Sequence, residues 1–393
     1  MKEKEQYIDF DAYERAKEPH KREKAYYWAT AIGLQKVDGL ETSDYLKEVA
    51  QRNIEGEINI EKAQELVRTY YQSKVNHDGD NDDKQEADLA STHIAQLLSE
   101  PTFAFTVAGL QAIHKRIFQG IFKFAGKIRD YDITKKEWVL RGDTVLYVSA
   151  PDIRRAIEYD LEQEREFSYK DMSLDEMIPH IAKFVSGIWQ IHPFGEGNTR
   201  TTAVFTIKYL RSLGFKVEND IFAKNAWYFR NALVRANYHN YEKNIDYNYS
   251  FIERFFRNLL LGEHNELKNR YMLINPPEEW KQTDPTSNPS SNPSSNPSSN
   301  PSSKKNENFL TDNEYILKLV SSIKEEFLSL HQIMTALGLK DRVSFRKVYL
   351  VPALEEGFIK MLHPENPKHP RQKYLLTVKG LALYNNIKEK NKR

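Results

Sequence analysis

Apolar side chains recur every three to four residues along most of the chain up to residue 261, which is the period of an amphipathic helix. Near the N-terminus this spacing predicts helices at residues 13–34, 42–54 and 59–71, with Thr42 and Asn59 as N-caps. Further along the chain it predicts helices at residues 87–98, 107–118, 151–167, 177–191, 201–213, 226–237 and 251–261. The pattern therefore predicts a mainly α fold.

One internal region departs from the helical period. From Asp130 to Ser149 the chain is rich in β-branched and aromatic residues around an Arg-Gly-Asp turn. Such residues favour paired strands over a helix, and the turn gives the two runs a place to reverse. We expect a β-hairpin flap here, projecting from the helical body.

The C-terminal residues 309–393 form a second kind of unit. Helical spacing here alternates with two short strand-like runs, GFIKML and QKYLLT, which a Pro-rich loop joins. This order fits a small α+β winged-helix domain whose second helix, at residues 342–355, carries Arg342, Arg346 and Lys347 on or near one face. A basic face of this kind suits DNA, but winged helices also dock proteins, and the sequence leaves both partners open.

Composition divides the chain into four segments. Four Asn-Pro-Ser-Ser repeats lie before residue 304, and proline at every fourth position forbids a helix, so we expect residues 276–308 to be a disordered linker. A weaker boundary is the acidic stretch at residues 77–86. The expected domains are an N-terminal helical segment at 1–78, a core at 85–275, the linker, and the winged-helix domain at 309–393.

The composition also excludes several kinds of chemistry. The 393 residues contain no cysteine, which excludes disulfides, thiolate nucleophiles and cysteine-ligated metals. No run of about 18 apolar residues occurs and the N-terminus lacks an apolar signal core, so we expect a cytoplasmic protein with no membrane partner. The net charge of +1 hides an asymmetry, because residues 304–393 hold 17 Lys/Arg against 10 Asp/Glu.

The strongest chemical signal is the run HPFGEGNTR from His192 to Arg200. An apolar helix ends at the histidine, Pro193 stops it, and a second apolar helix begins after a loop containing Gly195 and Gly197. Free N–H groups at the start of the second helix favour an anion in this loop, and the glycines allow it a close approach.

The side chains of the loop suit a nucleoside triphosphate. Glu196 offers oxygen to Mg²⁺, Asn198 is a neutral donor to a phosphate oxygen, and Arg200 can donate two hydrogen bonds to phosphate. His192 is the candidate general base, because an imidazole accepts a proton near neutral pH.

This run resembles the HPFx(D/E)GNGR signature of Fic-domain proteins, and the resemblance extends over about residues 87–267, including FAGKIR at 124–129. It implies a Fic-type helical core that transfers AMP from ATP to a Ser, Thr or Tyr hydroxyl of a target protein with Mg²⁺. His192 would be the base, Glu196 the metal ligand, Asn198 the α-phosphate donor and Arg200 the β-phosphate clamp, while the flap would dock the target.

A weaker part of the same resemblance lies at residues 229–237. Leu233 and Asn237 match the nucleobase wall of the family, and their spacing keeps them on one helical face. Two positions depart from the signature. Thr199 replaces its second glycine, and Ala203 stands where a second arginine is expected to contact the γ-phosphate.

The N-terminal segment resembles the small helical antitoxins that occur beside or fused to Fic domains. In that family a glutamate pairs with the second arginine and blocks the γ-phosphate. Asp38 occupies the corresponding position, followed by Gly39, and Leu34 stands where a hydroxyl residue is expected. Because the acid is shorter and the second arginine is absent, we expect this segment to pack on the core but to inhibit weakly or differently.

These observations predict a Mg²⁺-dependent protein adenylyltransferase that modifies a target protein or itself. Two alternatives remain. The same fold transfers other phosphate-containing groups, such as UMP or a phosphoryl group. The chain could also be a DNA-binding regulator whose Fic domain only senses nucleotide, although sensing gives no reason for the base His192.

Overall fold

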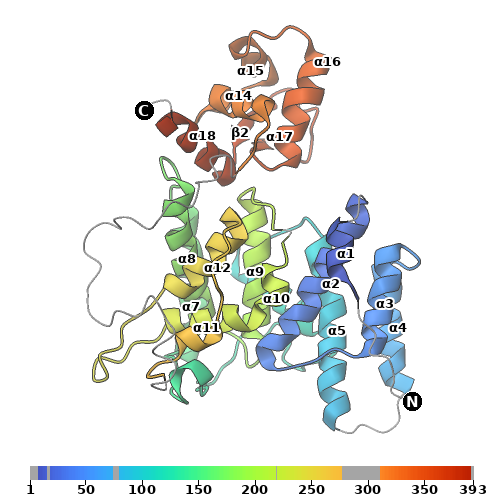
Figure 1. Ribbon diagram of the computed structural model, residues 1–393, viewed down its shortest axis with the longest axis vertical. Helices are drawn as coiled ribbons and strands as arrows, with labels where there is room; N and C mark the ends of the chain where they lie inside the picture. The colour runs from blue at the N-terminus through green and yellow to red at the C-terminus, as the bar shows by residue number, and fades with distance from the viewer. Residues whose placement is uncertain (1–7, 16–17, 74–78, 218, 277–309, 391–393) are drawn as a thin grey trace.

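The computed structural model describes the chain except for residues 1–7, 16–17, 74–78, 218, 277–309 and 391–393. It is mostly helical, as predicted, and Figure 1 shows a helical body with a smaller domain at one end. The predicted linker at 276–308 lies outside the described residues from 277 onward. None of the helices in the described part combines the length and hydropathy that a membrane span requires.

The N-terminal helices follow the predicted pattern with two changes. The region predicted as one helix contains two, α1 (Phe10–Arg15) and α2 (Pro19–Gly33), and α2 begins at a proline that suits a first helical position. The N-cap of α3 (Asp44–Glu55) is Ser43 and not Thr42, because the Ser43 hydroxyl accepts from Leu46 N at 3.1 Å. Asn59 does cap α4 (Ile60–Ser73), as its side chain accepts from Lys62 N at 2.8 Å.

Most helices of the body lie close to their predicted positions, but the first begins eight residues before the predicted start and the short helix at Ile221–Lys224 was not predicted. The body helices are α5 (Gly79–Ser99), α6 (Val107–Phe118), α7 (Ile153–Glu166), α8 (Leu174–Ile191), α9 (Asn198–Ser212), α10 (Ile221–Lys224), α11 (Ala226–Ala236) and α12 (Ser250–Leu261). Short 3₁₀ turns are η1 (Leu34–Asp38), η3 (Ala150–Asp152) and η4 (Asn269–Met272). The acidic stretch at 77–86, a weak boundary by composition, lies from Gly79 on within the first turns of α5.

The flap at residues 130–149 doubles back, but not as the paired strands of the predicted hairpin. Glu137 N donates to Asp143 O at 2.9 Å, and the 3₁₀ turn η2 (Trp138–Leu140) fills the bend between them. The side chains of Val139 and Val145 are buried in the body. Burial of these apolar residues in the helical body, and not a strand partner, therefore holds the segment in place.

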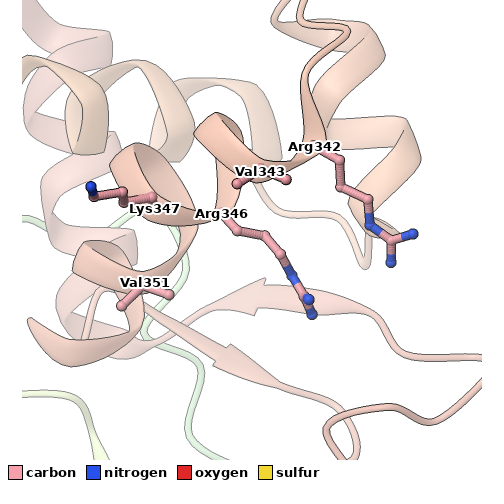
Figure 2. A pocket seen from close by; sticks show the side chains of 5 residues that line it. All are labelled: Arg342, Val343, Arg346, Lys347 and Val351. Carbon is pink, nitrogen blue, oxygen red and sulfur yellow. The ribbon is translucent and has the colours of Figure 1, made fainter.

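The C-terminal domain has the predicted order of elements. Its helices are α14 (Glu314–Ile323), α15 (Leu330–Ala336), α16 (Arg342–Phe345), the π-helical η5 (Arg346–Leu350), α17 (Val351–Glu355) and α18 (Val378–Lys390). Strands β1 (Ile359–Met361) and β2 (Tyr374–Leu376) pair antiparallel, with Lys360 opposite Leu375, and they are the only strands in the described part of the chain. Figure 2 shows Arg342, Val343, Arg346, Lys347 and Val351 lining a shallow pocket on α16, η5 and α17.

This domain packs directly on the ends of the body helices. Lys379 N donates to Leu213 O at 3.1 Å, just beyond α9, and the Asn385 side chain donates to Met172 O at 3.0 Å, just before α8. Gly214 (φ +94°) faces Gly357 (φ +76°), and a Cβ built on either would lie within 2.3 Å of the backbone of the other. Only two glycines permit this approach.

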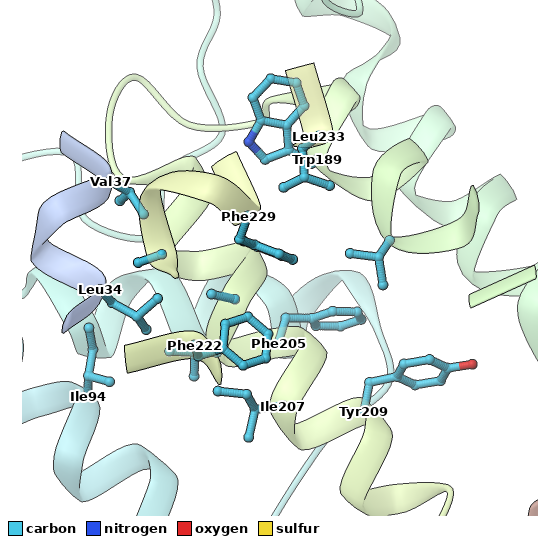
Figure 3. Close-up of a cluster of buried hydrophobic side chains, with 14 of the residues drawn as sticks. Leu34, Val37, Ile94, Trp189, Phe205, Ile207, Tyr209, Phe222, Phe229 and Leu233 are labelled. Carbon is cyan, nitrogen blue, oxygen red and sulfur yellow. The ribbon is translucent and has the colours of Figure 1, made fainter. Parts of the chain in front are cut away.

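A single hydrophobic cluster joins the N-terminal helices to the body, while the C-terminal domain has a second cluster of its own. Figure 3 shows part of the first cluster, where Leu34 and Val37 of η1 lie beside helices of the body. Both side chains are fully buried. The N-terminal helices are thus packed into the same core as the helices that carry the site, as the sequence led us to expect of that segment.

Candidate active site

The predicted anion loop lies between two long, well-buried helices. α8 ends at Ile191, where His192 adopts a left-handed conformation with φ +50° before Pro193. α9 begins after Gly197, which has φ +74°. The first N–H groups of α9 have no partner within the helix, and its dipole is positive at this end, so the loop favours an anion.

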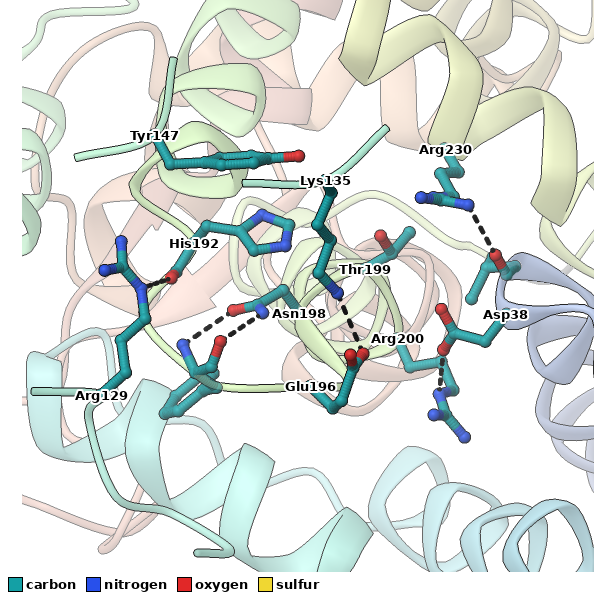
Figure 4. A network of polar contacts seen from close by, with 12 residues as sticks. Asp38, Arg129, Lys135, Tyr147, His192, Glu196, Asn198, Thr199, Arg200 and Arg230 are labelled. Carbon is teal, nitrogen blue, oxygen red and sulfur yellow. Dashed lines mark hydrogen bonds and ion pairs between the residues drawn. The ribbon is translucent and has the colours of Figure 1, made fainter. Parts of the chain in front are cut away.

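The His192 ring is held on several sides, and Figure 4 shows it with its neighbours. Its Nδ1 lies 3.2 Å from Trp189 O, and its centroid lies 4.2 Å from that of the Tyr147 ring. A carbonyl oxygen can only accept, so Nδ1 carries the hydrogen and Nε2 keeps its lone pair. Burial, with only 3% of the residue exposed, lowers the pKa of His192 well below its usual value. The ring is therefore neutral and able to accept a proton at Nε2.

Asn198 and Thr199 hold the loop closed. The Asn198 side chain accepts from Phe194 N at 2.9 Å and donates to Phe194 O at 2.8 Å. Thr199 Oγ1 accepts from Trp189 Nε1 at 3.0 Å, which ties the start of α9 to the end of α8. Asn198 thus donates one of its two amide hydrogens within the loop itself. Its predicted role as a phosphate donor would use the other hydrogen.

Phe194 is a core residue that anchors the loop from beneath. It is 1% exposed, and its ring stacks on His114 with centroids 3.8 Å apart. The His114 Nδ1 accepts from Gly126 N at 2.8 Å, so its Nε2 carries a hydrogen and donates to Glu196 O at 3.0 Å. Burial lowers the pKa of His114 to about 4, which keeps this tautomer neutral.

Neighbouring protein atoms approach both loop glycines, but only at Gly197 is the neighbour a fixed, buried ring, since Tyr131 beside Gly195 is 54% exposed. A Cβ on Gly195 would lie 2.7 Å from the Tyr131 hydroxyl, and a Cβ on Gly197 would lie 2.2 Å from the Phe118 ring. Phe118 is fully buried, so its ring cannot move away without disturbing α6.

Gly197→Ala is therefore expected to lower the stability of the protein markedly. The substitution combines a left-handed backbone, costing about 1–2 kcal/mol for an L-residue, with overpacking, which costs typically about 1–3 kcal/mol. The matched control is Gly56→Ala, whose φ is +84° but whose Cβ would meet nothing within 4 Å. Thermal unfolding followed by circular dichroism should give a lower Tm for Gly197→Ala than for the control. Equal losses would contradict the Phe118 contact.

The carboxylate of Glu196 lies on the open side of the loop. Its side chain is 52% exposed and pairs with Lys135 Nζ of the flap at 3.0 Å. No group of three or more acidic or histidine side chains suited to a metal occurs among the described residues. A Mg²⁺ ion held by one or two carboxylates together with substrate phosphates does not need such a group.

Arg200 has an acidic partner that the sequence did not lead us to expect. Its Nε forms an ion pair with Asp38 Oδ2 at 2.8 Å, so Asp38 does have an arginine partner, although not the one that Ala203 replaces. Two further acceptors complete the shell of Arg200. They are Gln35 Oε1 on Nη1 at 2.9 Å and Glu86 Oε1 on Nη2 at 2.6 Å. The guanidinium, 2% exposed, is enclosed by protein groups, and its Nε forms the ion pair with Asp38 but no hydrogen bond.

Leu233 and Asn237 of the predicted nucleobase wall are buried. Leu233 belongs to the hydrophobic core, and the Asn237 side chain donates to Ser186 O on α8 at 3.0 Å. They do lie on the face of α11 that packs against α8. Their role toward a nucleobase stays a prediction.

Several residues of the site could not be found from local sequence signals. Lys135, Tyr147, Gln35 and Glu86 reach the loop from segments 45 or more residues away, and only folding brings them together. Arg129, the last residue of the FAGKIR run, donates from Nε to His192 O at 2.9 Å and from Nη1 to Tyr131 O at 2.6 Å. The run, which entered the family resemblance without a role for Arg129, thus ends in a residue that supports the loop.

Comparison with known proteins finds family matches for two regions of the chain. Residues 104–210 match the Fic/DOC family, and residues 314–377 match the C-terminal domain of Filamentation induced by cAMP protein Fic-like. The protein adenylyltransferase VbhT of Bartonella schoenbuchensis is 25% identical over 183 residues, which are 45% of this chain and 36% of that protein. The chain thus matches about a third of the length of this relative.

A solved structure of a Fic family protein from Desulfovibrio desulfuricans G20 is also similar, at 18% identity and a TM-score of 0.38, covering 90% of this chain and 87% of that one. This TM-score is too low for that structure to assign the fold or function of the chain. The family assignment depends on the two matched regions, and the whole His192–Arg200 loop lies within the first of them. The chain therefore carries a Fic/DOC family domain at residues 104–210 and a Fic-like C-terminal domain at residues 314–377.

Proposed function

We propose that the protein is an adenylyltransferase that moves AMP from ATP to a Ser, Thr or Tyr hydroxyl of a target protein, with His192 as the general base. The observation that carries the proposal is the Nδ1 contact with Trp189 O, which leaves a neutral Nε2 able to take the proton of an attacking hydroxyl. The start of α9 would receive the phosphates, and the match to the adenylyltransferase of Bartonella schoenbuchensis favours AMP as the transferred group.

Glu196 is the residue that would hold Mg²⁺. Its carboxylate is half exposed and offers the hard oxygen ligand that this ion prefers. When bound, the ion would neutralise phosphate charge. Lys135 pairs with the same carboxylate, so Lys135 would have to leave it when the ion binds. The released ammonium group would remain close to the phosphates.

We also propose that the N-terminal segment inhibits transfer by occupying Arg200. The Asp38 carboxylate of this segment, together with Glu86 of α5 in the core, takes the guanidinium that would otherwise clamp a phosphate. This differs from the mode that the family resemblance implies, in which the acid pairs with a second arginine. Ala203 stands where the family's second arginine is expected, and the acid pairs with Arg200 instead.

Incubation of the purified full chain with ATP, Mg²⁺ and a cell lysate tests the transfer. Intact-mass measurement of the modified proteins should show a gain of about 329 Da for AMP, against about 80 Da for a phosphoryl group. The Arg200 contacts predict slow transfer by the unaltered chain, so the Asp38→Asn variant should be assayed beside it. A product gaining only about 80 Da, or no product from either protein, would reject adenylyl transfer.

A further inference from the structure

A buried polar chain lies behind the His192 ring. Tyr147, whose ring lies tilted by 38° against the imidazole, donates its hydroxyl to Glu137 Oε1 at 3.3 Å. Glu137 comes from the other arm of the flap and is 2% exposed. Its carboxylate is bound by Arg230 Nη2 of α11 at 3.1 and 2.9 Å. A tyrosine, a carboxylate and a guanidinium therefore connect the base to α11.

The remaining donor of Arg230 reaches the N-terminal segment. Its Nη1 donates to Val37 O of η1 at 3.4 Å, one residue before Asp38. The Arg230 guanidinium also lies over the Trp227 ring, 5.2 Å from its centroid. Arg230 is thus fixed by the flap, by η1 and by its own helix, and Figure 4 shows it on the same side of the site as Asp38.

The ion pair between Glu137 and Arg230 lies in the interior, where burying a carboxylate costs free energy of folding. Burial raises the pKa of Glu137, and the Arg230 charge acts in the opposite direction. An ion pair in such a place is at best near neutral for stability compared with apolar residues of the same size. What it does provide is a fixed position for the Tyr147 hydroxyl, and hence for the ring that covers one face of His192.

We propose that Glu137 and Arg230 are positioning residues that hold the His192 ring in its working orientation through Tyr147. None of the three touches the reacting atoms in this arrangement. The inference rests on the proposed function in that it takes His192 as the base. A base misplaced by about 1 Å costs on the order of 10²-fold in rate, so removing the Tyr147 ring should slow the transfer step without removing any contact to ATP.

The experiment uses the full chain with the substitutions Tyr147→Leu and Tyr147→Phe. Matched controls are Tyr159→Leu and Tyr159→Phe, because Tyr159 lies on α7 and is 63% exposed. The maximal rate and the KM for ATP are measured with labelled ATP. The His192 imidazole is followed by NMR of ¹³Cε1-labelled histidine, with its signal assigned by its loss in His192→Ala.

We expect Tyr147→Leu to lower kcat by about 10- to 100-fold with little change in KM, and to shift or broaden the His192 signal. Tyr147→Phe keeps the ring and should lose less. The double variant Glu137→Gln with Arg230→Met removes both charges together, so that no unpaired charge is buried, and should also lose kcat and disturb the His192 signal. The Tyr159 controls should match the unaltered chain.

The outcomes separate this inference from the proposed function. If neither the unaltered chain nor Asp38→Asn transfers AMP, the proposed function fails, while the NMR signal still reports whether Tyr147 and the ion pair orient His192. If AMP is transferred but Tyr147→Leu changes neither kcat nor the His192 signal, the positioning role is wrong and the function stands. A rise in KM at constant kcat would also overturn it, because that pattern marks ligand contact.

Discussion

His192→Ala is expected to slow AMP transfer by about 10²- to 10⁴-fold, the usual contribution of a positioned base. The affinity for ATP should change little, because in the proposed mechanism the base would act on the acceptor hydroxyl while the start of α9 and its side chains would hold the phosphates. Transfer is measured with labelled ATP, and ATP binding by calorimetry on the same preparation.

His20→Ala is the matched control, since His20 is an exposed histidine of α2, far along the chain from the loop. It should leave both rate and affinity unaltered. Two results would contradict the role of His192. One is a variant that still transfers AMP at the normal rate, and the other is a variant that loses ATP affinity as strongly as it loses activity.

Asp38→Asn combined with Glu86→Gln is expected to raise ATP affinity and transfer by about tenfold or more. Each substitution keeps the size of the side chain and removes one negative charge from the surroundings of Arg200. Arg200 donates a hydrogen bond to Glu86 and forms an ion pair with Asp38, and a phosphate has to replace both carboxylates. A hydrogen bond to a charged group contributes about 1.5–3 kcal/mol. Each single variant should give part of the increase.

Glu41→Gln serves as the control for this pair, because Glu41 is an exposed acid three residues beyond Asp38. It should change neither affinity nor rate. Thermal unfolding of each variant distinguishes release of Arg200 from partial loss of the N-terminal helices. Unchanged ATP affinity in the double variant, with the fold intact, would show that these carboxylates do not compete with the nucleotide.

Most of the fold could be predicted because its helices are long and strongly periodic. The helix at 107–118 was predicted to the residue, and most of the other body helices to within about three residues at each end. The flap was predicted as a hairpin because its residue types favour strands. That preference was overridden by burial of Val139 and Val145 against the helical body, which no local pattern indicates.

The loop itself could be predicted from its sequence, because its residues are adjacent and a helix start is a general anion site. The surroundings of Arg200 could not. Glu86 appeared to be part of an acidic boundary stretch, and its partnership with Arg200 joins residues 114 positions apart. With Ala203 at the position of the expected second arginine, the sequence left Asp38 without an arginine partner, and only the folded chain shows that it pairs with Arg200.

The contact between Gly214 and Gly357 limits how this protein can diverge. Each glycine belongs to a different domain, and each leaves no room for a side chain on the other. Substitution at either glycine would push the two domains apart. A change in one domain at this position would therefore need a compensating change in the other domain. Grafting an unrelated module onto this body would therefore require a glycine at the point that meets the end of α9.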